Sequence, residues 1–418
     1  MANIIDDLNY RGLIKDYSNE EEIRELLSTP QTIYCGFDPS ASSMHIGNFV
    51  MIATLMRLQR AGHRIIAVVG GGTGMIGDPS GKSKERNLQT EEGVKQNTLA
   101  IKAQLERFLD LSDPNKGILL NNYDWLSKIS LLEYLRDYAK YFNINYMLAK
   151  DIISSRLEVG ISLTEFTYMT LQSIDFLKLH RDYNCNIQIG GSDQWGNLTA
   201  GLDLIRKLDG ADQKVGCMTS HLITRSDGKK FGKSEDGALF LDPKLTSPYK
   251  LYQFFYNQGD EDSVKYLKVF TFLTKEEITA IEKDHLEHLG SRIAQKVLAY
   301  EVTKIIHGEN KASEAKDISE ALFKEEFSSL TKENIEELYS SYSLTIHSDL
   351  KVEDLLIEIK AASSKREARE FIKNNAVSIN GKKYNDANYV LNEQDYLYSK
   401  YLIVKRGKKN YYLVKKES

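Results

Sequence analysis

TIYCGFDPSASSMHIGN, residues 32–48, contains an apolar run, a short turn rich in serine, and the start of a helical pattern. Residues 32–37 have the composition of a buried strand. From residue 44 to residue 61 apolar side chains recur at helical spacing, and Gly62 stands where such a helix should stop. The stretch therefore predicts a strand that leads through a short turn into a helix.

The same alternation of strand and helix returns along the first half of the chain. RIIAVVG (64–70) and CNIQIGG (185–191) are two further apolar runs that end in glycine. Residues 197–208 follow a helical pattern that stops before Gly210. This alternation predicts an α/β fold class with a Rossmann-like parallel sheet covered by helices. In such sheets a ligand binds beyond the carboxyl ends of the strands.

The chain has 418 residues, too many for one compact core, and its pattern changes along its length. We expect the sheet-forming domain over 1–246 and an α-helical domain over 247–320. Residues 321–350 are polar and acidic, and we interpret them as a linker. Residues 351–418 contain a basic helical stretch, a tight turn at Asn380–Gly381 and a hairpin pattern, which predict a small α+β C-terminal domain.

Bulk composition excludes a membrane-spanning or disulfide-rich protein at the level of the sequence. Hydrophobic residues make up 41% and charged residues 27%, and apolar runs fall far below the ~20 residues that cross a bilayer. The first ten residues carry two acids and no apolar stretch, so we expect no signal peptide and a cytoplasmic location. Cys35, Cys185 and Cys217 have neither metal-ligand spacing nor an even number.

Charge is distributed unevenly along the chain. The overall net charge is −4, but residues 360–418 hold fourteen Lys and Arg against six Asp and Glu, which leaves +8 there and −12 elsewhere. A basic tail on an acidic body indicates an RNA or another anionic partner. The candidate RNA-binding residues, on the basic helix and the hairpin tip, are Lys365, Arg366, Arg369, Lys405, Arg406, Lys408 and Lys409.

The glycines at 72, 74 and 77 match the G-x-G-x-x-G dinucleotide pattern directly after a strand. We reject that interpretation because Asp78–Pro79 follows at once and no second strand ends in an acid at the expected distance. The neighbouring GDPSGKS (77–83) is one residue short of a phosphate-binding loop. The glycines still allow the backbone to approach a ligand closely.

The helical stretch LTEFTYMTLQSIDFLKL, 163–179, is apolar nearly all round and is therefore expected to be buried. Tyr168, Gln172 and Asp175 are spaced four and three apart, so they share one face. A polar stripe on a buried helix needs partners inside the protein. The stripe predicts either a satisfied core network or a polar ligand, with IQIGGSDQWGN (187–197) as a second wall.

Three segments carry a family resemblance. HIGN (45–48), at a predicted helix start that suits phosphate, resembles the HIGH signature of class I aminoacyl-tRNA synthetases, with Asn48 in place of the second histidine. KKFGKS (229–234) resembles their KMSKS loop, with Phe231 and Gly232 departing. GGGTGMIGDPSGKSKER (70–86) resembles the enzymes for tyrosine in particular. Together with the stripe, these segments resemble bacterial tyrosyl-tRNA synthetases over nearly the whole chain.

The resemblance implies roles at individual positions. Contacts to tyrosine are implied for Tyr34, Asp78, Tyr168, Gln172, Asp175, Gln188 and Gln194. Contacts to ATP are implied for Cys35, Gly36, Asp38, Gly47, Gly191, Asp193, Lys230 and Lys233. Catalytic contacts to the phosphates are implied for His45, Asn48, Lys82, Arg86, Lys230, Lys233 and Ser234. No metal ligand from the protein is expected.

The family performs two steps, tyrosyl-adenylate formation from tyrosine and ATP with Mg²⁺, and transfer to the tRNA 3′ end. The resemblance therefore implies ATP, Mg²⁺, L-tyrosine and tRNA(Tyr) as ligands, and a homodimer. The tail resembles an RNA-binding module shared with a small-subunit ribosomal protein. Two alternatives stay open: a tryptophanyl-tRNA synthetase, and a catalytically inactive RNA-binding regulatory protein on the same scaffold.

Overall fold

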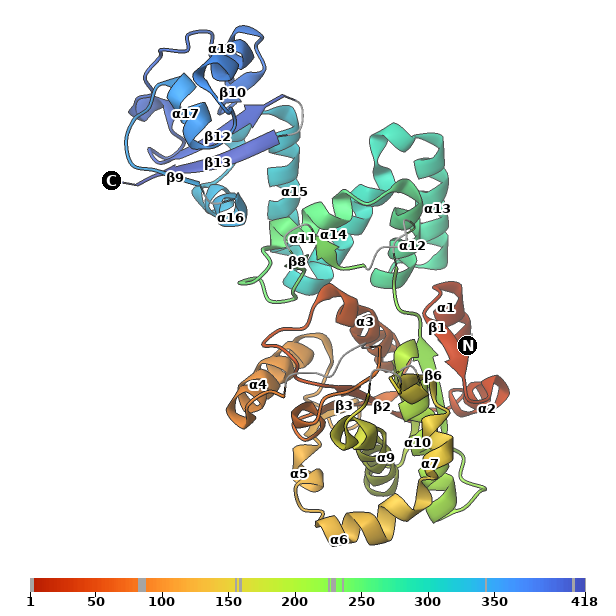
Figure 1. Cartoon of the computed structure of the whole chain (residues 1–418). Helices are drawn as coiled ribbons and strands as arrows, with labels where there is room; N and C mark the ends of the chain where they lie inside the picture. The colour runs from red at the N-terminus through yellow and green to blue at the C-terminus, as the bar shows by residue number, and fades with distance from the viewer. Residues whose placement is uncertain are drawn as a thin grey trace. The chain divides into compact units, whose positions relative to one another are not determined.

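The computed structural model describes residues 4–81, 88–154, 156–157, 160–224, 226, 231–234, 237–342, 344–407 and 410–417. The chain forms two compact units, and Figure 1 colours the chain by residue number from the N-terminus to the C-terminus. The first consists of Met1–Asp242 and Val264–Ala280, and the second of Pro243–Ser263 and Ile281–Ser418. The domain boundaries expected from the sequence stay a prediction, since compact units and functional domains need not coincide.

A six-stranded sheet forms the centre of the first unit, and its strand order is β1-β6-β5-β2-β3-β4. In this order, the bounds are β1 (Ile14–Tyr17), β6 (Gly216–Ser220), β5 (Cys185–Gly191), β2 (Thr32–Phe37), β3 (Arg64–Val69) and β4 (Gly117–Asn121). The strands β6 to β4 run parallel, and β1 pairs antiparallel with β6. The predicted fold class is confirmed. The chain moves outward from β2 in both directions, so the point between β2 and β5 is the topological switch point.

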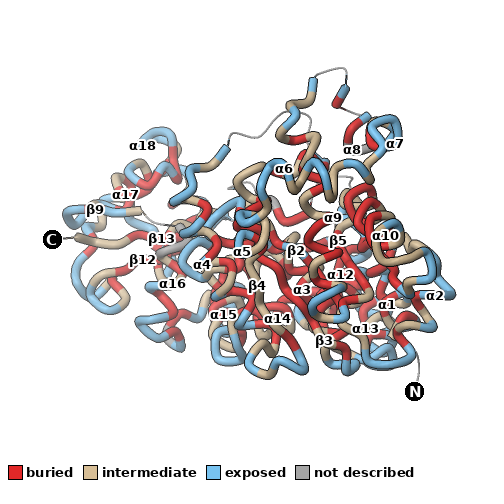
Figure 2. Tube along the Cα trace, turned by 90° about the horizontal axis from the view of Figure 1, so that it is seen from below, coloured by how far each residue is buried: buried red, intermediate tan, exposed pale blue. Residues whose placement is uncertain are grey.

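Helices cover both faces of this sheet, because strands buried on two sides need apolar partners on each. Figure 1 shows α3 (Ile46–Arg60) and α4 (Glu91–Phe108) on one side of the strands. On the other side, α9 (Leu163–Tyr183) and α10 (Trp195–Asp209) share a core with side chains of the strands. Figure 2 shows the strands and the inward faces of these helices as the buried part of the unit.

The remaining helices and strands of the first unit are short. They are α1 (Ile4–Tyr10), α2 (Glu20–Leu26), α5 (Tyr123–Leu126), α6 (Leu131–Glu133), α7 (Ile144–Leu148), α8 (Asp151–Ser154), β7 (Lys233–Ser234) and β8 (Gly237–Ala238). A π-helical turn (Tyr134–Tyr138) follows α6 directly. Helices α12 (Asp260–Phe270) and α13 (Lys275–Glu287) contribute residues to both units.

The second unit contains a helical part and a five-stranded sheet of order β11-β10-β12-β13-β9. Its helices are α11 (Pro248–Tyr256), α14 (Ile293–His307), α15 (Glu309–Lys324), α16 (Lys332–Tyr342), α17 (Val352–Glu358) and α18 (Lys365–Lys373). Its strands are β9 (Leu344–Ile346), β10 (Val377–Ile379), β11 (Lys382–Lys383), β12 (Tyr401–Arg406) and β13 (Asn410–Lys416). Asn380 and Gly381 both have positive φ and form the predicted turn between β10 and β11.

The residues after 308, of which 321–350 were interpreted as a polar linker, contain the helices α15 and α16. The buried stripe of α15 consists mainly of alanines: Ala312, Ala315 and Ala321. Alanine contributes little to hydropathy but lets helices pack closely, so the helical period was present but weak. Among the described residues, no helix has both the length and the apolar character that a bilayer crossing requires.

Candidate active site

A cavity of about 640 Å³ opens at the carboxyl ends of β2 and β5, where the strand order reverses. The first residues of α3 and the polar stripe of α9 complete its walls. The predicted tyrosine, ATP and phosphate residues that line it are Tyr34, Cys35, Gly36, Asp38, His45, Gly47, Asn48, Asp78, Tyr168, Gln172, Asp175, Gln188, Gly191, Asp193 and Gln194. The structure thus brings together residues separated by up to 160 positions in the chain.

The predicted cationic loop residues are the exception. Lys82, Arg86 and Lys230 lie outside the described residues. The backbone of Lys233 and Ser234 forms β7, while their side chains lie outside the description. Their place relative to the cavity stays a prediction.

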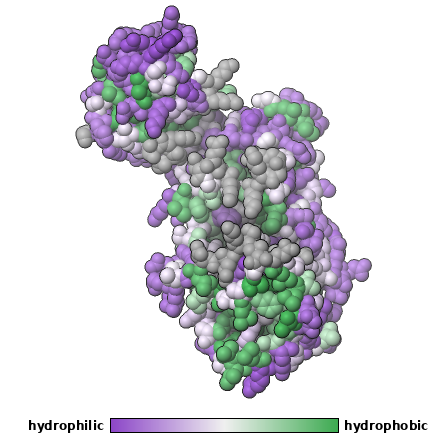
Figure 3. Space-filling model, viewed as in Figure 1, coloured by the Kyte–Doolittle hydropathy of each residue, from purple (hydrophilic) through white to green (hydrophobic). Residues whose placement is uncertain are grey.

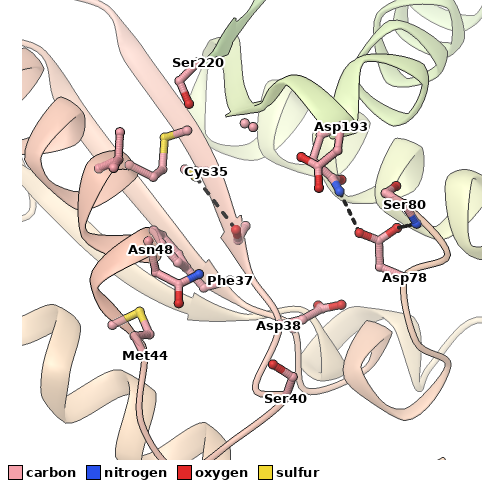
Figure 4. Close-up of a pocket in the computed structure, with 18 of the residues that line it drawn as sticks. Cys35, Phe37, Asp38, Ser40, Met44, Asn48, Asp78, Ser80, Asp193 and Ser220 are labelled. Carbon is pink, nitrogen blue, oxygen red and sulfur yellow. Dashed lines mark hydrogen bonds between the residues drawn. The ribbon is translucent and has the colours of Figure 1, made fainter. Parts of the chain in front are cut away.

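The HIGN segment caps the helix α3. The backbone N–H of Gly47 donates to His45 Nδ1 at 3.0 Å, and the backbone N–H of His45 donates to Asn48 Oδ1 at 3.0 Å. This reciprocal pair is a capping box made by histidine and asparagine. Because the oxygen of Asn48 accepts the cap bond, its Nδ2 group is the part of the side chain that remains to donate to a ligand. Figure 4 shows Asn48 and Met44 at this end of α3, near Phe37 and Asp38.

Asp175 on α9 is buried to 1% exposure and accepts hydrogen bonds at both carboxylate oxygens. Trp125 Nε1 donates to Oδ1 at 2.7 Å, and Asn122 Nδ2 donates to Oδ2 at 2.9 Å. Burial raises the pKa of Asp175 to about 7, although these two donors oppose the shift. The hydroxyl of Tyr34 lies in the same buried region. Its pKa is raised, mainly by desolvation and secondly by the charge of Asp175. This end of the cavity suits a ligand that brings its own hydrogen-bond donor.

A chain of hydrogen bonds joins Asp175 to a second carboxylate. Asn122 Nδ2 also donates to Thr73 Oγ1 at 2.9 Å, and Thr73 donates to Asp38 Oδ1 at 2.7 Å. The Tyr168 hydroxyl donates to Asp38 Oδ2 at 2.8 Å. Burial is the largest cause of the raised pKa of Tyr168, so the phenol stays protonated and keeps donating. Two acids on different elements are therefore fixed in one network.

Asp78 forms the centre of a third polar group. Gln194 Nε2 donates to its Oδ2 at 2.6 Å. The backbone N–H of Ser80 donates to its Oδ1 at 3.0 Å, and Figure 4 shows Ser80 beside Asp78. Asn197 Nδ2 donates to Gln194 Oε1 at 3.0 Å and so fixes that side chain. The network leaves Gln188 Oε1 without a partner among the described residues, although Gln188 is only 1% exposed and lines the cavity. This buried oxygen is available to accept from a ligand.

Three of these positioning residues were missed by sequence reasoning: Thr73, Asn122 and Trp125. Thr73 stands inside the glycine-rich segment, where the glycines drew the attention. Asn122 and Trp125 follow β4, a strand that was not recognised because GILLN is short. A search for polar residues directly after every short apolar run could have found Asn122, since the switch-point rule places them at the cavity.

The predicted RNA-binding residues divide into two groups. Lys365 pairs with Asp354 at 2.7 Å, Arg369 with Glu353 at 2.5 Å and Lys405 with Glu325 at 2.5 Å. Arg406 Nη1 donates to the carbonyl of Ala361 at 2.6 Å. Arg366 is exposed and makes no ion pair within the described part of the chain, and Lys408 and Lys409 lie outside it.

Two known protein families match consecutive parts of the chain. A family model described as class I tRNA synthetases (W and Y) matches residues 27–324. A second, the tyrosine–tRNA ligase SYY-like C-terminal domain, matches residues 334–414.

Solved structures agree with these matches. A C-terminally truncated mitochondrial tyrosyl-tRNA synthetase of Aspergillus nidulans is 31% identical with a TM-score of 0.70, over 77% of this chain and 95% of that chain. The corresponding truncated enzyme of Coccidioides posadasii is 30% identical with a TM-score of 0.67, over 76% and 92%. A tryptophanyl-tRNA synthetase of Encephalitozoon cuniculi, 14% identical with a TM-score of 0.55 over 79% and 89%, shares the fold alone.

The raised pKa of Asp175 predicts a pH dependence of stability. The folded protein holds a proton on Asp175 up to about pH 7, whereas the unfolded chain releases it near the ordinary value of 3.8. Stability therefore falls as pH rises between these values. Asp175→Asn should gain roughly 2 kcal/mol relative to the parent between pH 5 and pH 8, since one pKa unit is about 1.4 kcal/mol.

Urea unfolding followed by tryptophan fluorescence can measure this difference, because both tryptophans, Trp125 and Trp195, lie in the first unit. Asp175→Asn also changes the hydrogen bonds from Asn122 and Trp125, which alters the free energy of unfolding by the same amount at every pH. Comparing the same variant at two pH values removes this constant contribution. Trp125→Phe is the matched second variant, read by circular dichroism, and should move the midpoint of the dependence to higher pH. A difference between Asp175→Asn and the parent that stays constant from pH 5 to pH 8 would contradict the assignment.

Proposed function

Because the chain belongs to the tyrosine–tRNA ligase family of class I aminoacyl-tRNA synthetases, we propose that its cavity holds tyrosine at the Asp175 end and ATP beside α3. The observation that carries this proposal is the buried carboxylate of Asp175, which faces the cavity beside Tyr34. The phenol hydroxyl of tyrosine can donate a hydrogen bond to this carboxylate. We assign the ammonium group of tyrosine to Asp78, Tyr168 and Gln172. Gln188 and Gln194 are assigned to the neighbouring wall of the tyrosine site.

The nucleotide has a physical rationale of its own at the other end of the cavity. The N-terminal end of α3 carries the positive end of the helix dipole, which attracts phosphate oxygens, and the side chains of His45 and Asn48 stand at that end. An added Cβ at Gly191 would lie 2.6 Å from the carboxylate of Asp193, so a larger residue at this position would displace Asp193. We assign Cys35, Asp38 and Asp193 to the ribose side, and Lys82, Arg86, Lys230, Lys233 and Ser234 to the phosphates.

The first step is attack by the tyrosine carboxylate oxygen on the α-phosphorus of ATP, with cleavage of the bond to pyrophosphate. A carboxylate is a nucleophile at neutral pH, so the site needs no general base. It must align the two reactants and stabilise charge that builds on the phosphates. The second step moves the tyrosyl group to a ribose hydroxyl at the 3′ end of the tRNA and releases AMP.

Class I enzymes use ATP as a substrate, generally with Mg²⁺. Among the described residues, no group of three or more His, Cys, Asp or Glu side chains could hold a metal. Asp38 and Asp78 already accept hydrogen bonds from protein donors. We therefore expect the ion to enter with ATP, where it would neutralise charge on the phosphates.

Pyrophosphate exchange with a panel of amino acids tests the substrate. We predict exchange with tyrosine, and an exchange rate at least about 10⁴-fold lower with phenylalanine. Sites built to hydrogen-bond a hydroxyl are known to discriminate in this range, and tyrosyl-tRNA synthetases are themselves the standard example. Tryptophan should give no exchange. Asp175→Ala should abolish the preference for tyrosine over phenylalanine. Exchange with tryptophan would favour the tryptophan enzyme, and no exchange at all would favour an inactive RNA-binding protein.

We also propose that two copies of the chain associate through an apolar face of the first unit. Figure 3 shows a broad hydrophobic area there. Its large exposed side chains are Leu131, Leu132, Leu135, Ile144 and Leu163, each between 52% and 78% exposed. Patches of this kind on soluble proteins mark interaction sites. A second copy is the occupant that the family resemblance implies.

Leu132→Glu is predicted to convert the dimer to a monomer. Leu132 is 78% exposed, so the substitution leaves the core intact while placing a charge in the interface. Sedimentation velocity measures the outcome. Phe323→Glu is the control, because Phe323 is 83% exposed but lies in the second unit. A parent protein that is monomeric, or a Leu132→Glu variant that stays dimeric, would refute the assigned face.

The C-terminal part is proposed to bind tRNA through cations that are not used within the domain. Lys365, Arg369 and Lys405 are engaged by acids of the protein, which lowers their value for phosphate. Arg366 and Lys373 are exposed on α18, seven residues apart and so on one face, and neither has an ion-pair partner in the described ranges. This face is our revised candidate for the RNA contact.

A cytoplasmic location likewise remains a proposal, supported by three free cysteines.

Charge reversal of Arg366 and Lys373 together should raise the KM for tRNA roughly tenfold and flatten its salt dependence, because phosphate contacts release counterions. Tyrosine-dependent pyrophosphate exchange should not change. Lys15→Glu with Lys178→Glu makes the same charge change on the first unit and serves as the control. Equal effects of both double variants would assign the result to net charge, against the proposed face.

A further inference from the structure

One buried glutamine outside the assigned site is tied to the segment that carries His45. Gln104 on α4 is 7% exposed, and it lies 60 residues beyond the backbone that it contacts. Its Oε1 accepts from the backbone N–H of Met44 at 2.9 Å, and its Nε2 donates to Ser43 Oγ at 2.8 Å. Ser43 Oγ in turn donates to the carbonyl of Met44 at 2.9 Å. One side chain thus fixes the two residues directly before His45.

The same segment is also hydrogen-bonded to the chain that follows the KFGKS loop. Leu241 N–H donates to the carbonyl of Met44 at 2.8 Å, and Ile46 N–H donates to the carbonyl of Leu239 at 2.8 Å. His45 forms an antiparallel bridge with Phe240 between them. The segment 43–46 is therefore held both by the side chain of Gln104 and by the backbone of 239–241.

The loop itself touches the start of α3 at one described residue. Gly232 has φ +81°, and a Cβ there would lie 2.7 Å from Ile46 Cγ2. Its carbonyl accepts from Leu239 N–H at 3.1 Å. Phe231, the neighbouring residue, packs on Tyr266 and Phe270 of α12 with ring centroids 4.8 and 5.1 Å apart. The HIGN segment and the base of the KFGKS loop are thus parts of one hydrogen-bonded assembly.

We propose that Gln104 is a positioning residue for tyrosine activation, which it serves by holding both signature segments in register toward the triphosphate. The inference rests on the proposed function, because it assumes that His45 faces the phosphates. A transition state with charge on several phosphate oxygens requires donors placed to a fraction of an ångström. Without Gln104 the buried N–H of Met44 loses its partner, and the segment must shift to reach another. Once pyrophosphate has left, this placement has no further task.

The test uses Gln104→Met, which keeps the length of the side chain and removes both hydrogen bonds. Single-turnover adenylate formation at saturating substrates should slow about tenfold or more, where each tenfold step corresponds to about 1.4 kcal/mol in the barrier. The dissociation constant for tyrosine should stay within about twofold. Transfer from preformed enzyme-bound adenylate to tRNA should also stay within about twofold. Ser43→Ala removes only the partner of Gln104 Nε2. It should slow adenylate formation less than Gln104→Met does, again with tyrosine binding and transfer nearly unchanged.

Gln59→Met is the matched control. Gln59 also accepts from a backbone N–H, that of Asp110 at 2.9 Å, and donates to carbonyls of Asp110 and Lys116, but at the far end of α3. It should lower stability without slowing activation selectively. If Gln104→Met and Gln59→Met slow both half-reactions alike, or Gln104→Met leaves activation unchanged, the positioning role is overturned. His45→Ala distinguishes failure of the proposed function from failure of the Gln104 role. If His45→Ala activates tyrosine at the normal rate, the assignment of His45 to the phosphates is overturned, and the role of Gln104 with it.

Discussion

A parallel sheet covered on both faces is the constraint on which the other features of the first unit depend. Its strands need helices on each side, and the chain must cross from one edge to the other after β4. That crossing leaves a gap beyond the ends of β2 and β5 that no helix fills. The cavity is therefore a consequence of strand order, and the sequence only had to supply the side chains that face it.

Most carboxylates of this cavity are fixed by protein donors, and this has two consequences. Asp175, Asp38 and Asp78 each accept hydrogen bonds from side chains of other elements, so their positions are set without a ligand. Burial also makes an unpaired charge costly, which keeps the pKa of Asp175 near 7 and rewards a ligand that brings a donor. Preorganisation and the proposed selectivity for a hydroxyl thus have the same origin.

Charge pairing plays a different part in the C-terminal sheet domain. Glu353 and Glu325 neutralise basic residues that the composition alone would offer to RNA. The excess of positive charge counted along the sequence is therefore larger than the charge available at the surface. The unpaired cations of α18 are fewer, but they lie on one face, and geometry rather than number decides which phosphates they can meet.

The sequence alone was sufficient for the α/β class and the bounds of β5, because local period is written in consecutive positions, and the family resemblance indicated many, though not all, of the residues that line the cavity. It could not show that Asn122 and Trp125 hold Asp175, since those contacts span 50 residues or more and have no local signal. Nor could it show that Lys405 is paired with Glu325, 80 residues earlier. Hydrogen bonds and ion pairs between distant segments depend on how the elements pack, and packing exists only in the folded chain.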